Sequence, residues 1–169
     1  EKLLNEQQDT ITEAKEILNN APDVLNAIQR MSDESAELKK QVEAFVHEKI
    51  MHLRDLLLSE AKEINGAKII HYQGHLTADQ VKTLAFQIRN IQSEKLFFVA
   101  GCVADGKPSL TVLLSDDLVA AGFNAVNIAR DAAKEIQGGG GGQPFFASAG
   151  GKNAAGIEKA IAKALEAVK

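Results

Sequence analysis

Residues 138–156 read GGGGGQPFFASAGGKNAAG and hold eight of the thirteen glycines in this chain of 169 residues. Five consecutive glycines lose more conformational entropy on folding than an ordinary connector does, and an apolar run and a second glycine pair follow them directly. A flexible linker therefore does not explain the segment. Glycine allows backbone N–H groups to approach an anion, or allows the backbone to pack closely against a neighbouring element. The segment predicts a phosphate or nucleic-acid backbone site, with close packing as the alternative.

Basic side chains flank the glycine segment. Lys152 lies at the N-terminus of a helix that we expect to begin near Asn153. Arg130 and Lys134 lie on the helix before the glycine run. The first turn of a helix carries unpaired N–H groups and the positive end of the helix dipole, and both favour an anion. The sequence therefore predicts that these cations and the glycine backbone act together on a phosphate.

The residues around this segment predict a layered globular domain over 65–169. Short β-branched or apolar runs indicate strands, and apolar residues at helical spacing indicate amphipathic helices. The expected strands are 67–72, 96–103, 109–114 and 144–149, and the expected helices are 77–91, 125–136 and 153–168. This order, β-α-β-β-α-β-α, predicts an α/β (α+β) domain with a small mixed sheet of about four strands.

Residues 1–64 contain no glycine and are rich in Glu and Lys, a composition that favours helix. Apolar residues recur at spacings of three and four on both sides of an interruption at 19–22. We therefore expect a long antiparallel helical hairpin, a coiled-coil arm, ahead of the globular domain. The second helix is about twice as long as the first. Its distal apolar residues thus need cover from the globular part or from a second copy of the chain; they include Leu53, Leu56, Leu57 and Ile64.

The formal net charge of -4 is the sum of two unlike parts. Residues 1–64 hold 8 basic and 14 acidic side chains, a net charge of -6, whereas 65–169 hold 11 and 9, a net charge of +2. The acidity belongs to the arm, so the net charge of -4 does not exclude a nucleic-acid partner for the second part.

The expected location is cytoplasmic. No apolar run reaches the length of a membrane helix, and no basic-then-apolar signal stands at the start of the sequence. A single cysteine, Cys102, fits a reducing compartment. The sequence begins at Glu1 within a helical pattern, which is typical of a piece of a longer protein.

Candidate catalytic or metal-binding residues are few. His71 and His75 have H-x-x-x-H spacing, and a second pair with Cys-x-x-x-His spacing would complete a set of four zinc ligands. However, His71 falls in an expected strand, and Gly106 rather than a histidine stands four positions after Cys102. The zinc-binding set is therefore incomplete. Cys102 lies in an apolar strand and is expected to be an inert core thiol. We expect no catalytic residue, metal or cofactor in this chain.

The glycine run, the following QPFFASAGGKN (143–153) and the helices NAVNIARDAAKEI (124–136) and IEKAIAKALEAV (157–168) resemble the C-terminal end of alanyl-tRNA synthetases. A related domain accompanies DHH-type phosphoesterases. The resemblance implies a non-catalytic module that grips the elbow of the tRNA for alanine, links aminoacylation with editing and often takes part in self-association. It also implies that the whole protein is a ligase of protein biosynthesis, to whose other parts ATP and zinc belong.

The resemblance also implies where RNA binds. The family's glycine motif corresponds to Gly138–Gly142, Gly150 and Gly151. Together with neighbouring polar and basic residues, the candidate RNA-binding set is Arg130, Lys134, Gly138, Gly139, Gly140, Gly141, Gly142, Gln143, Ser148, Gly150, Gly151, Lys152 and Asn153. Phe145 or Phe146 could stack on exposed bases. Adjacent residues of a strand point to opposite faces, so at least one of the two is expected in the core.

Two other functions stay open at this point. The chain could be chiefly a dimerisation element, with the apolar seam at 53–64 as its interface. It could also be the substrate-binding half of a DHH-type phosphoesterase, although the helical hairpin and the missing catalytic half count against that. The expected partners are therefore tRNA, the remainder of a synthetase chain and a second copy, with no membrane.

Overall fold

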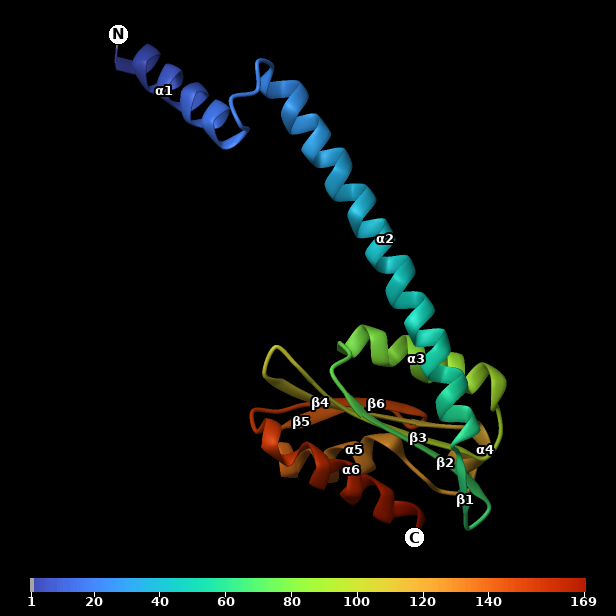
Figure 1. The fold of residues 1–169 in the computed structure, drawn as a ribbon. Helices are drawn as coiled ribbons and strands as arrows, with labels where there is room; N and C mark the ends of the chain where they lie inside the picture. Colours follow the sequence, from blue (N-terminus) through green and yellow to red (C-terminus); the bar gives the residue numbers. More distant parts are fainter. Residues whose placement is uncertain (1) are drawn as a thin grey trace. The chain divides into compact units, whose positions relative to one another are not determined.

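The computed structural model describes residues 2–169 (Figure 1). Its contacts divide the chain into two compact units, Glu1–Glu48 and Lys49–Lys169. The boundary falls inside helix α2, so the last part of that helix belongs to the second unit. Each unit is described by itself.

The first unit contains α1 (Lys2–Ile17) and most of α2 (Val24–Ser59). Asn19 and Asn20 adopt the left-handed conformation, with φ of 55° and 58°, which asparagine tolerates better than most residues. Asp23 then caps α2, because its Oδ1 accepts a hydrogen bond from the Asn26 N–H at 3.0 Å. These local interactions end one helix and begin the next.

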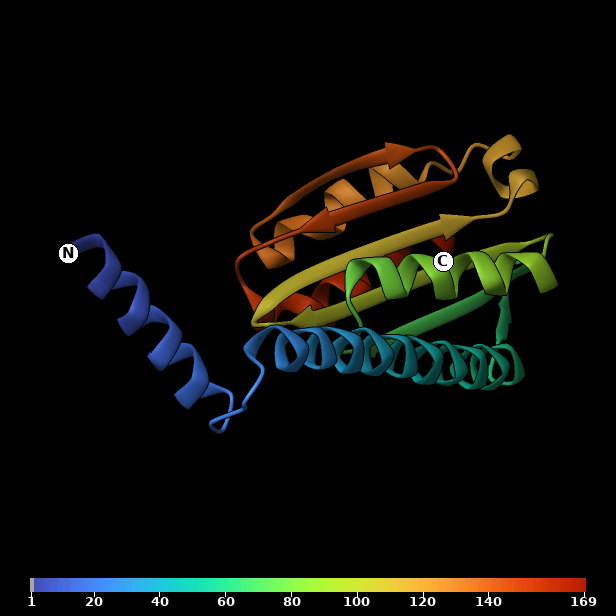
Figure 2. The ribbon, with the colours of Figure 1, turned by 90° about the horizontal axis from the view of Figure 1, so that it is seen from above.

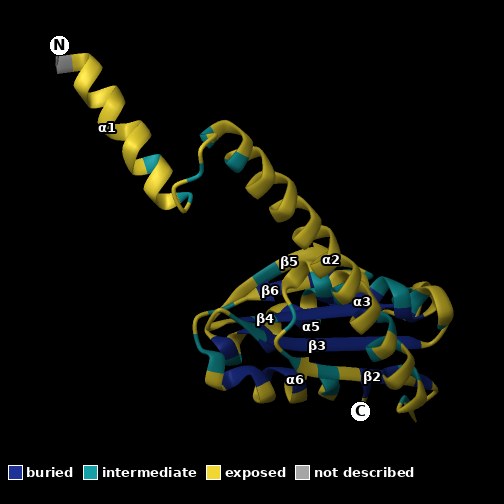
Figure 3. Cartoon of the chain, turned by 45° about the horizontal axis from the view of Figure 1, so that its top comes forward, coloured by how far each residue is buried: buried dark blue, intermediate teal, exposed yellow. Residues whose placement is uncertain are grey.

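Both helices of the expected arm are present, but their antiparallel packing is not. Leu4 on α1 is 68% exposed, and Leu38 and Val42 on α2 are each 60% exposed. The expected inward series of α1 includes Gln7 and Ala14, so it offers little apolar area to hold two helices together. The apolar faces of α1 and of the first part of α2 therefore remain exposed (Figure 3).

The second unit is built on a six-stranded mixed sheet of order β1-β2-β3-β4-β6-β5. Its strands are β1 (Lys62–Ile64), β2 (Ala67–Gly74), β3 (Leu96–Ala104), β4 (Lys107–Leu114), β5 (Gly139–Gln143) and β6 (Phe146–Gly150). Strands β2 and β3 are parallel, and the other neighbouring pairs are antiparallel. The predicted class is confirmed, but the sheet has six strands rather than four. Strand β1 is too short to give a pattern, and the glycine run of β5 has no β propensity.

Helices cover the two faces of the sheet unequally (Figures 1 and 2). Helix α3 (Ala78–Ile91) lies on one face, and α5 (Ala125–Ala133) and α6 (Ile157–Leu165) lie on the other. A capping box starts α3, because Thr77 Oγ1 accepts from the Gln80 N–H while Gln80 Oε1 accepts from the Thr77 N–H. The remaining short helices are α4 (Asp116–Ala120), η1 (Lys134–Ile136), η2 (Ala154–Gly156) and η3 (Glu166–Val168).

One core cluster lies between the sheet and the α5–α6 layer, and α3 buries further apolar side chains on the other face of the sheet. Phe97, Val99 and Val112 from β3 and β4 are fully buried in the first cluster against alanines of α5 and α6. Burying each of these larger side chains contributes about 1.5–3 kcal/mol. The far end of α2 also joins this unit, since Leu57 is only 7% exposed, whereas Leu56 remains 52% exposed. The globular unit thus covers part of the seam 53–64, and Leu53 and Ile64 are half-buried.

Candidate nucleic-acid interface

Gly138 and the four glycines of β5 fall into two alternating sets. A Cβ placed on Gly138, Gly140 or Gly142 would lie within 2.3 Å of a backbone oxygen of β6. A Cβ placed on Gly139 or Gly141 would meet no atom within 4 Å. The first set is therefore required by packing, as the alternative interpretation predicted. The second set is not explained by packing, because a side chain there would point into open space.

Arg130 belongs to the packed side of β5. Helix α5 presents small residues such as Ala129 to the sheet, so it approaches β5 and β6 closely. From this helix, Arg130 donates its Nε–H to the carbonyl oxygen of Gly140 at 3.1 Å. A charged side chain thus covers part of the exposed edge of the sheet, a common protection against pairing with another chain. Arg130 is therefore already engaged with the glycine strand.

Gly139 and Gly141 belong to a bare surface on the opposite face. Paired residues of antiparallel strands share a face, so Gly139 lies beside Gly150, and Gly141 beside Ser148. Gly150 in turn pairs with Ser109 of β4. In Figure 2, no helix of the second unit lies over β5 and β6 on this side. We call this surface the bare face; it consists of Gly139, Gly141, Gly150, Ser109 and Ser148.

Two lysines border the bare face at one end. A shallow depression of about 670 Å³ is lined there by Thr77, Ala78, Ala104, Lys107, Pro108, Ser109, Gln137, Gly138, Gly139, Gly150, Gly151 and Lys152. Neither Lys107 nor Lys152 forms an ion pair within residues 2–169. A backbone without side chains, two cations and a serine hydroxyl are groups that bind phosphate oxygens.

Sequence reasoning missed Lys107. It stands just after the Asp105-Gly106 turn and next to Pro108, and nothing in that position points to a ligand. The pairing of Ser109 with Gly150 brings the start of β4 next to the second glycine pair. Because this register joins segments about forty residues apart, only the folded chain reveals the cation.

The end of the glycine segment does not offer the predicted anion site at a helix N-terminus. The backbone N–H groups of Lys152 and Asn153 both donate to Ile136 O at 2.9 Å, and that of Gly151 donates to Pro108 O at 3.1 Å. Asn153 Nδ2 donates to Glu135 O at 3.3 Å. Helix α6 starts only at Ile157, after the turn η2. These N–H groups are already paired, so they hold the loop in place.

Lys134 does not line the depression beside the bare face. It forms an ion pair with Asp131 at 2.8 Å on the exposed surface of the helix. The hydrogen bond and charge of Lys134 lower the pKa of Asp131, and the same interaction raises the pKa of Lys134. The charge of this lysine is thus locally compensated.

The two phenylalanines lie at the other end of the bare face. Phe146 pairs with Gln143, its ring lies 5.4 Å from that of Phe86 on α3, and Lys82 Nζ stands 5.9 Å from its centroid. Phe145 lies under Arg89, which is 5.1 Å from its centroid. Both phenylalanines are half-buried, so the expectation that one is a core residue is wrong. Phe145 precedes the first residue of β6, and strand alternation does not apply to it.

The remaining candidate reactive residues, His75 and Cys102, form hydrogen bonds within the protein. His75 Nδ1–H donates to Val103 O at 2.9 Å. Burial raises the pKa of the Cys102 thiol, and backbone hydrogen bonds from Leu76 and Gly74 offset this in part. Within residues 2–169, no group of three or more His, Cys, Asp or Glu side chains is arranged to hold a metal ion. No helix in that range is long and apolar enough to cross a membrane.

Comparison with known proteins agrees with this architecture. The sequence matches the DHHA1 domain over residues 65–169. It is 53% identical over 166 residues to an alanine–tRNA ligase of Bacteroides thetaiotaomicron and 44% identical over 168 residues to one of Parabacteroides distasonis. These matches cover 98% and 99% of this chain but 19% of each relative, so the chain spans about a fifth of their length.

A solved structure has the same fold. It is the C-Ala domain from Aquifex aeolicus alanyl-tRNA synthetase, with a TM-score of 0.57 and 19% sequence identity. The match covers 64% of this chain and 96% of that one.

Proposed function

The chain belongs to the DHHA1 domain family, and we propose that it is the non-catalytic C-terminal tRNA-binding module of an alanine–tRNA ligase. In this role it docks the elbow of the tRNA for alanine and thereby links aminoacylation with editing on one tRNA. The similarity to alanine–tRNA ligases over 98% of the chain favours this role over that of a phosphoesterase half. The remainder of the synthetase chain, which would use ATP and act in the cytoplasm, is then its covalent partner.

The observation that carries the proposal is the bare face with Lys107 and Lys152 at one end. Packing requires glycine at 138, 140 and 142, but it leaves glycine at 139 and 141 unexplained. A sugar–phosphate backbone can approach a strand closely only where side chains are missing. The two lysines at its end supply positive charge, and the Ser148 hydroxyl supplies a hydrogen-bond donor, whereas the Ser109 hydroxyl already donates to Cys102 O at 3.5 Å.

Salt dependence of tRNA binding tests this assignment. The double variant Lys107→Gln/Lys152→Gln should bind tRNA for alanine more weakly, measured by fluorescence anisotropy over a range of salt concentrations. Each lost phosphate contact reduces the slope of log K against log salt by roughly 0.7–0.9, so we expect a total reduction of roughly 1.4–1.8.

The matched control for this test is Lys159→Gln. This lysine is exposed on α6, on the other side of the sheet, and should leave the slope unchanged. The assignment is wrong if the control and the double variant change the slope equally, or if the unmodified chain binds tRNA no better than an acidic protein does.

A second role, self-association, is favoured by the first unit. Ile28, Met31, Leu38 and Val42 are between 50% and 60% exposed and recur on one side of α2 at coiled-coil spacing, with Ser35 between them. Glu34 and Lys39 flank this stripe at positions that pair between parallel helices of a dimer. We therefore propose a homodimer through this stripe, rather than through the seam 53–64 that the globular unit partly covers.

Sedimentation velocity tests the homodimer. Leu38→Gln should shift the chain toward monomer, whereas Lys40→Gln, on the outer side of the same helix, should not. A monomer at high concentration before any substitution would exclude the dimer. This outcome would leave the tRNA assignment intact, because the bare face lies in the second unit.

A further inference from the structure

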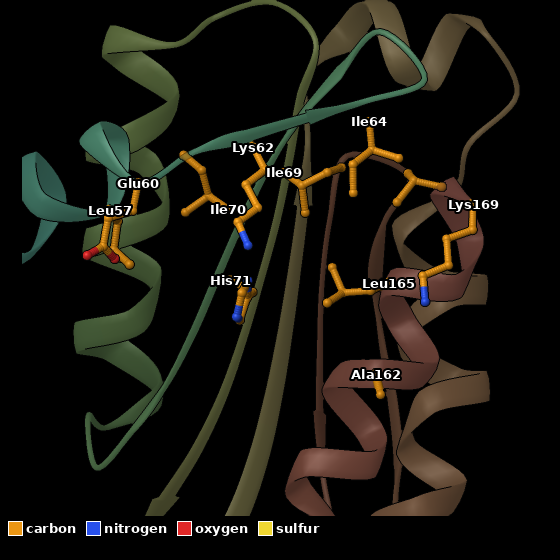
Figure 4. Close-up of a pocket in the computed structure, with 11 residues that line it drawn as sticks. Leu57, Glu60, Lys62, Ile64, Ile69, Ile70, His71, Ala162, Leu165 and Lys169 are labelled. Carbon is orange, nitrogen blue, oxygen red and sulfur yellow. The ribbon is translucent and has the colours of Figure 1, made fainter.

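A pocket of about 660 Å³ lies at the edge of the sheet farthest from the bare face. It is lined by Leu57, Glu60, Lys62, Ile64, Ile69, Ile70, His71, Ala162, Leu165, Val168 and Lys169 (Figure 4). All of these residues belong to the second unit. The pocket shares no residue with the depression between Lys107 and Lys152.

Strand length and helix position together leave this space open. Strand β1 pairs with β2 only from Ala67 to Ile69, so the outer side of β2 is uncovered from Ile70 onward. Helix α6 packs mainly against β3 and β4. The pocket therefore lies along the outer side of β2, between the end of α2 and helix α6 (Figure 4).

A turn next to the pocket holds its wall in place. Asn65 and Gly66 have φ of 51° and 81°, the left-handed pair of a tight hairpin that joins β1 to β2. The Asn65 side chain donates its Nδ2–H groups to Val168 O at 2.9 Å and to Lys169 O at 3.2 Å. The hairpin and the last turn are thus fastened together, which holds Ile64, Val168 and Lys169 of the lining in place.

The lining combines an apolar body with two unpaired cations. Ile64, Ile69 and Leu165 provide the apolar surface. The ammonium groups of Lys62 and Lys169 border it, and neither lysine forms an ion pair within residues 2–169. Glu60 is the single acidic residue of the lining. In Figure 4, Lys62 from β1 and His71 from β2 approach the same part of the space.

From this arrangement we propose that the pocket binds a small molecule with an apolar body and one carboxylate group. The volume is within the range of roughly 300–1,000 Å³ that is usual for small-molecule sites. Apolar side chains would take up the body of the ligand, and Lys62 or Lys169 would pair with its carboxylate, which is costly to bury alone.

Three probes with the same ten-carbon alkyl group and different head groups test whether the pocket prefers a negatively charged ligand. Decanoate, decanol and decyltrimethylammonium would be titrated separately into the full chain with ¹³C-labelled Ile, Leu and Val methyl groups. Decanoate should shift the methyl signals of Ile64, Ile69, Leu165 and Val168 at the lowest concentration, and the cation should shift them least. Equal responses to all three probes would overturn the proposal. Shifts that appear first at Ile28, Leu38 and Val42 would also overturn it, because they would indicate coating of the exposed stripe.

Two variants test the location of the site. Ala162→Phe fills the pocket from an exposed position of α6, so it should abolish the decanoate shifts without loss of the fold. Lys62→Gln/Lys169→Gln should weaken decanoate binding at least about fivefold while leaving decanol binding unchanged. Lys107→Gln is the control, because its lysine lies at the other end of the sheet. Unchanged decanoate binding in both variants would refute the proposed site, and far-ultraviolet circular dichroism verifies that each variant is folded.

Discussion

The outer strands of the sheet differ in what their residues contribute. Strand β5 is made almost entirely of backbone, with Arg130 covering one of its carbonyl groups. At the other edge, β1 and β2 contribute isoleucines and a lysine to a pocket, and a side chain of the hairpin holds its wall in place. At the β5 edge a ligand would meet main-chain groups with two lysines beside them, whereas at the other edge it would meet mainly apolar side chains. The difference teaches that glycine content alone does not define a site, because half of the glycines in β5 serve packing.

The largest expected effect separates the two glycine sets. Gly140→Val should lower the free energy of unfolding by more than about 3 kcal/mol, because its Cβ would overlap the backbone of β6. Gly141→Val should change it by less than about 0.5 kcal/mol, since its Cβ meets nothing and valine favours strands. Urea denaturation followed by circular dichroism measures both.

The same pair of variants sharpens the functional assignment. Gly141→Val should fold normally and yet bind tRNA for alanine more weakly, because its side chain would stand on the bare face. If Gly141→Val binds tRNA as tightly as the unmodified chain, Gly139 and Gly141 are not needed for binding. The two sets of glycines would then differ only in their effect on stability.

At the opposite edge, a smaller effect is expected from Asn65→Ala. Alanine tolerates the left-handed conformation poorly, and the two hydrogen bonds to the last turn are lost, so the free energy of unfolding should fall by about 2 kcal/mol. The methyl signals of Val168 and Leu165 should move as the pocket wall loosens. Asn127→Ala, at an exposed position of α5, is the matched control and should change stability by less than about 0.5 kcal/mol.

The smallest effect is expected from Arg130→Gln. Loss of one hydrogen bond to an exposed edge strand should cost about 1 kcal/mol or less. Hydrogen exchange should nevertheless become faster for the amide groups of β5, while those of β3 remain protected. Equal hydrogen-exchange rates for the β5 amide groups in Arg130→Gln and in the unmodified chain would mean that Arg130 does not protect this edge.

The sequence predicts the elements that carry side-chain patterns. The apolar run of β3, the hairpin to β4 and the capped helix after Thr77 are all found within two residues of their expected bounds. The glycine run escapes the prediction as a strand because its residues have no side chains to alternate. It is held in the sheet by pairing with β6, which no local pattern reveals.

The candidate site is predictable only in part for the same reason. Its glycines and Lys152 are visible as a cluster in the sequence, whereas Lys107 joins them through strand register. The expected anion site at Asn153 fails because the carbonyl oxygen of Ile136 already accepts hydrogen bonds from the backbone of that loop. Competition between a ligand and the protein's own acceptors is decided by tertiary structure, not by composition.

The contact between Asn65 and the carbonyl groups of Val168 and Lys169 also has a topological consequence. The two ends of the segment 65–169 lie side by side, so a short peptide could join them. New ends opened at the exposed Asp105-Gly106 turn would then give a circular permutant that keeps strands β2 to β6. In such a permutant the strands would follow one another in a different order along the chain while keeping their neighbours in the sheet.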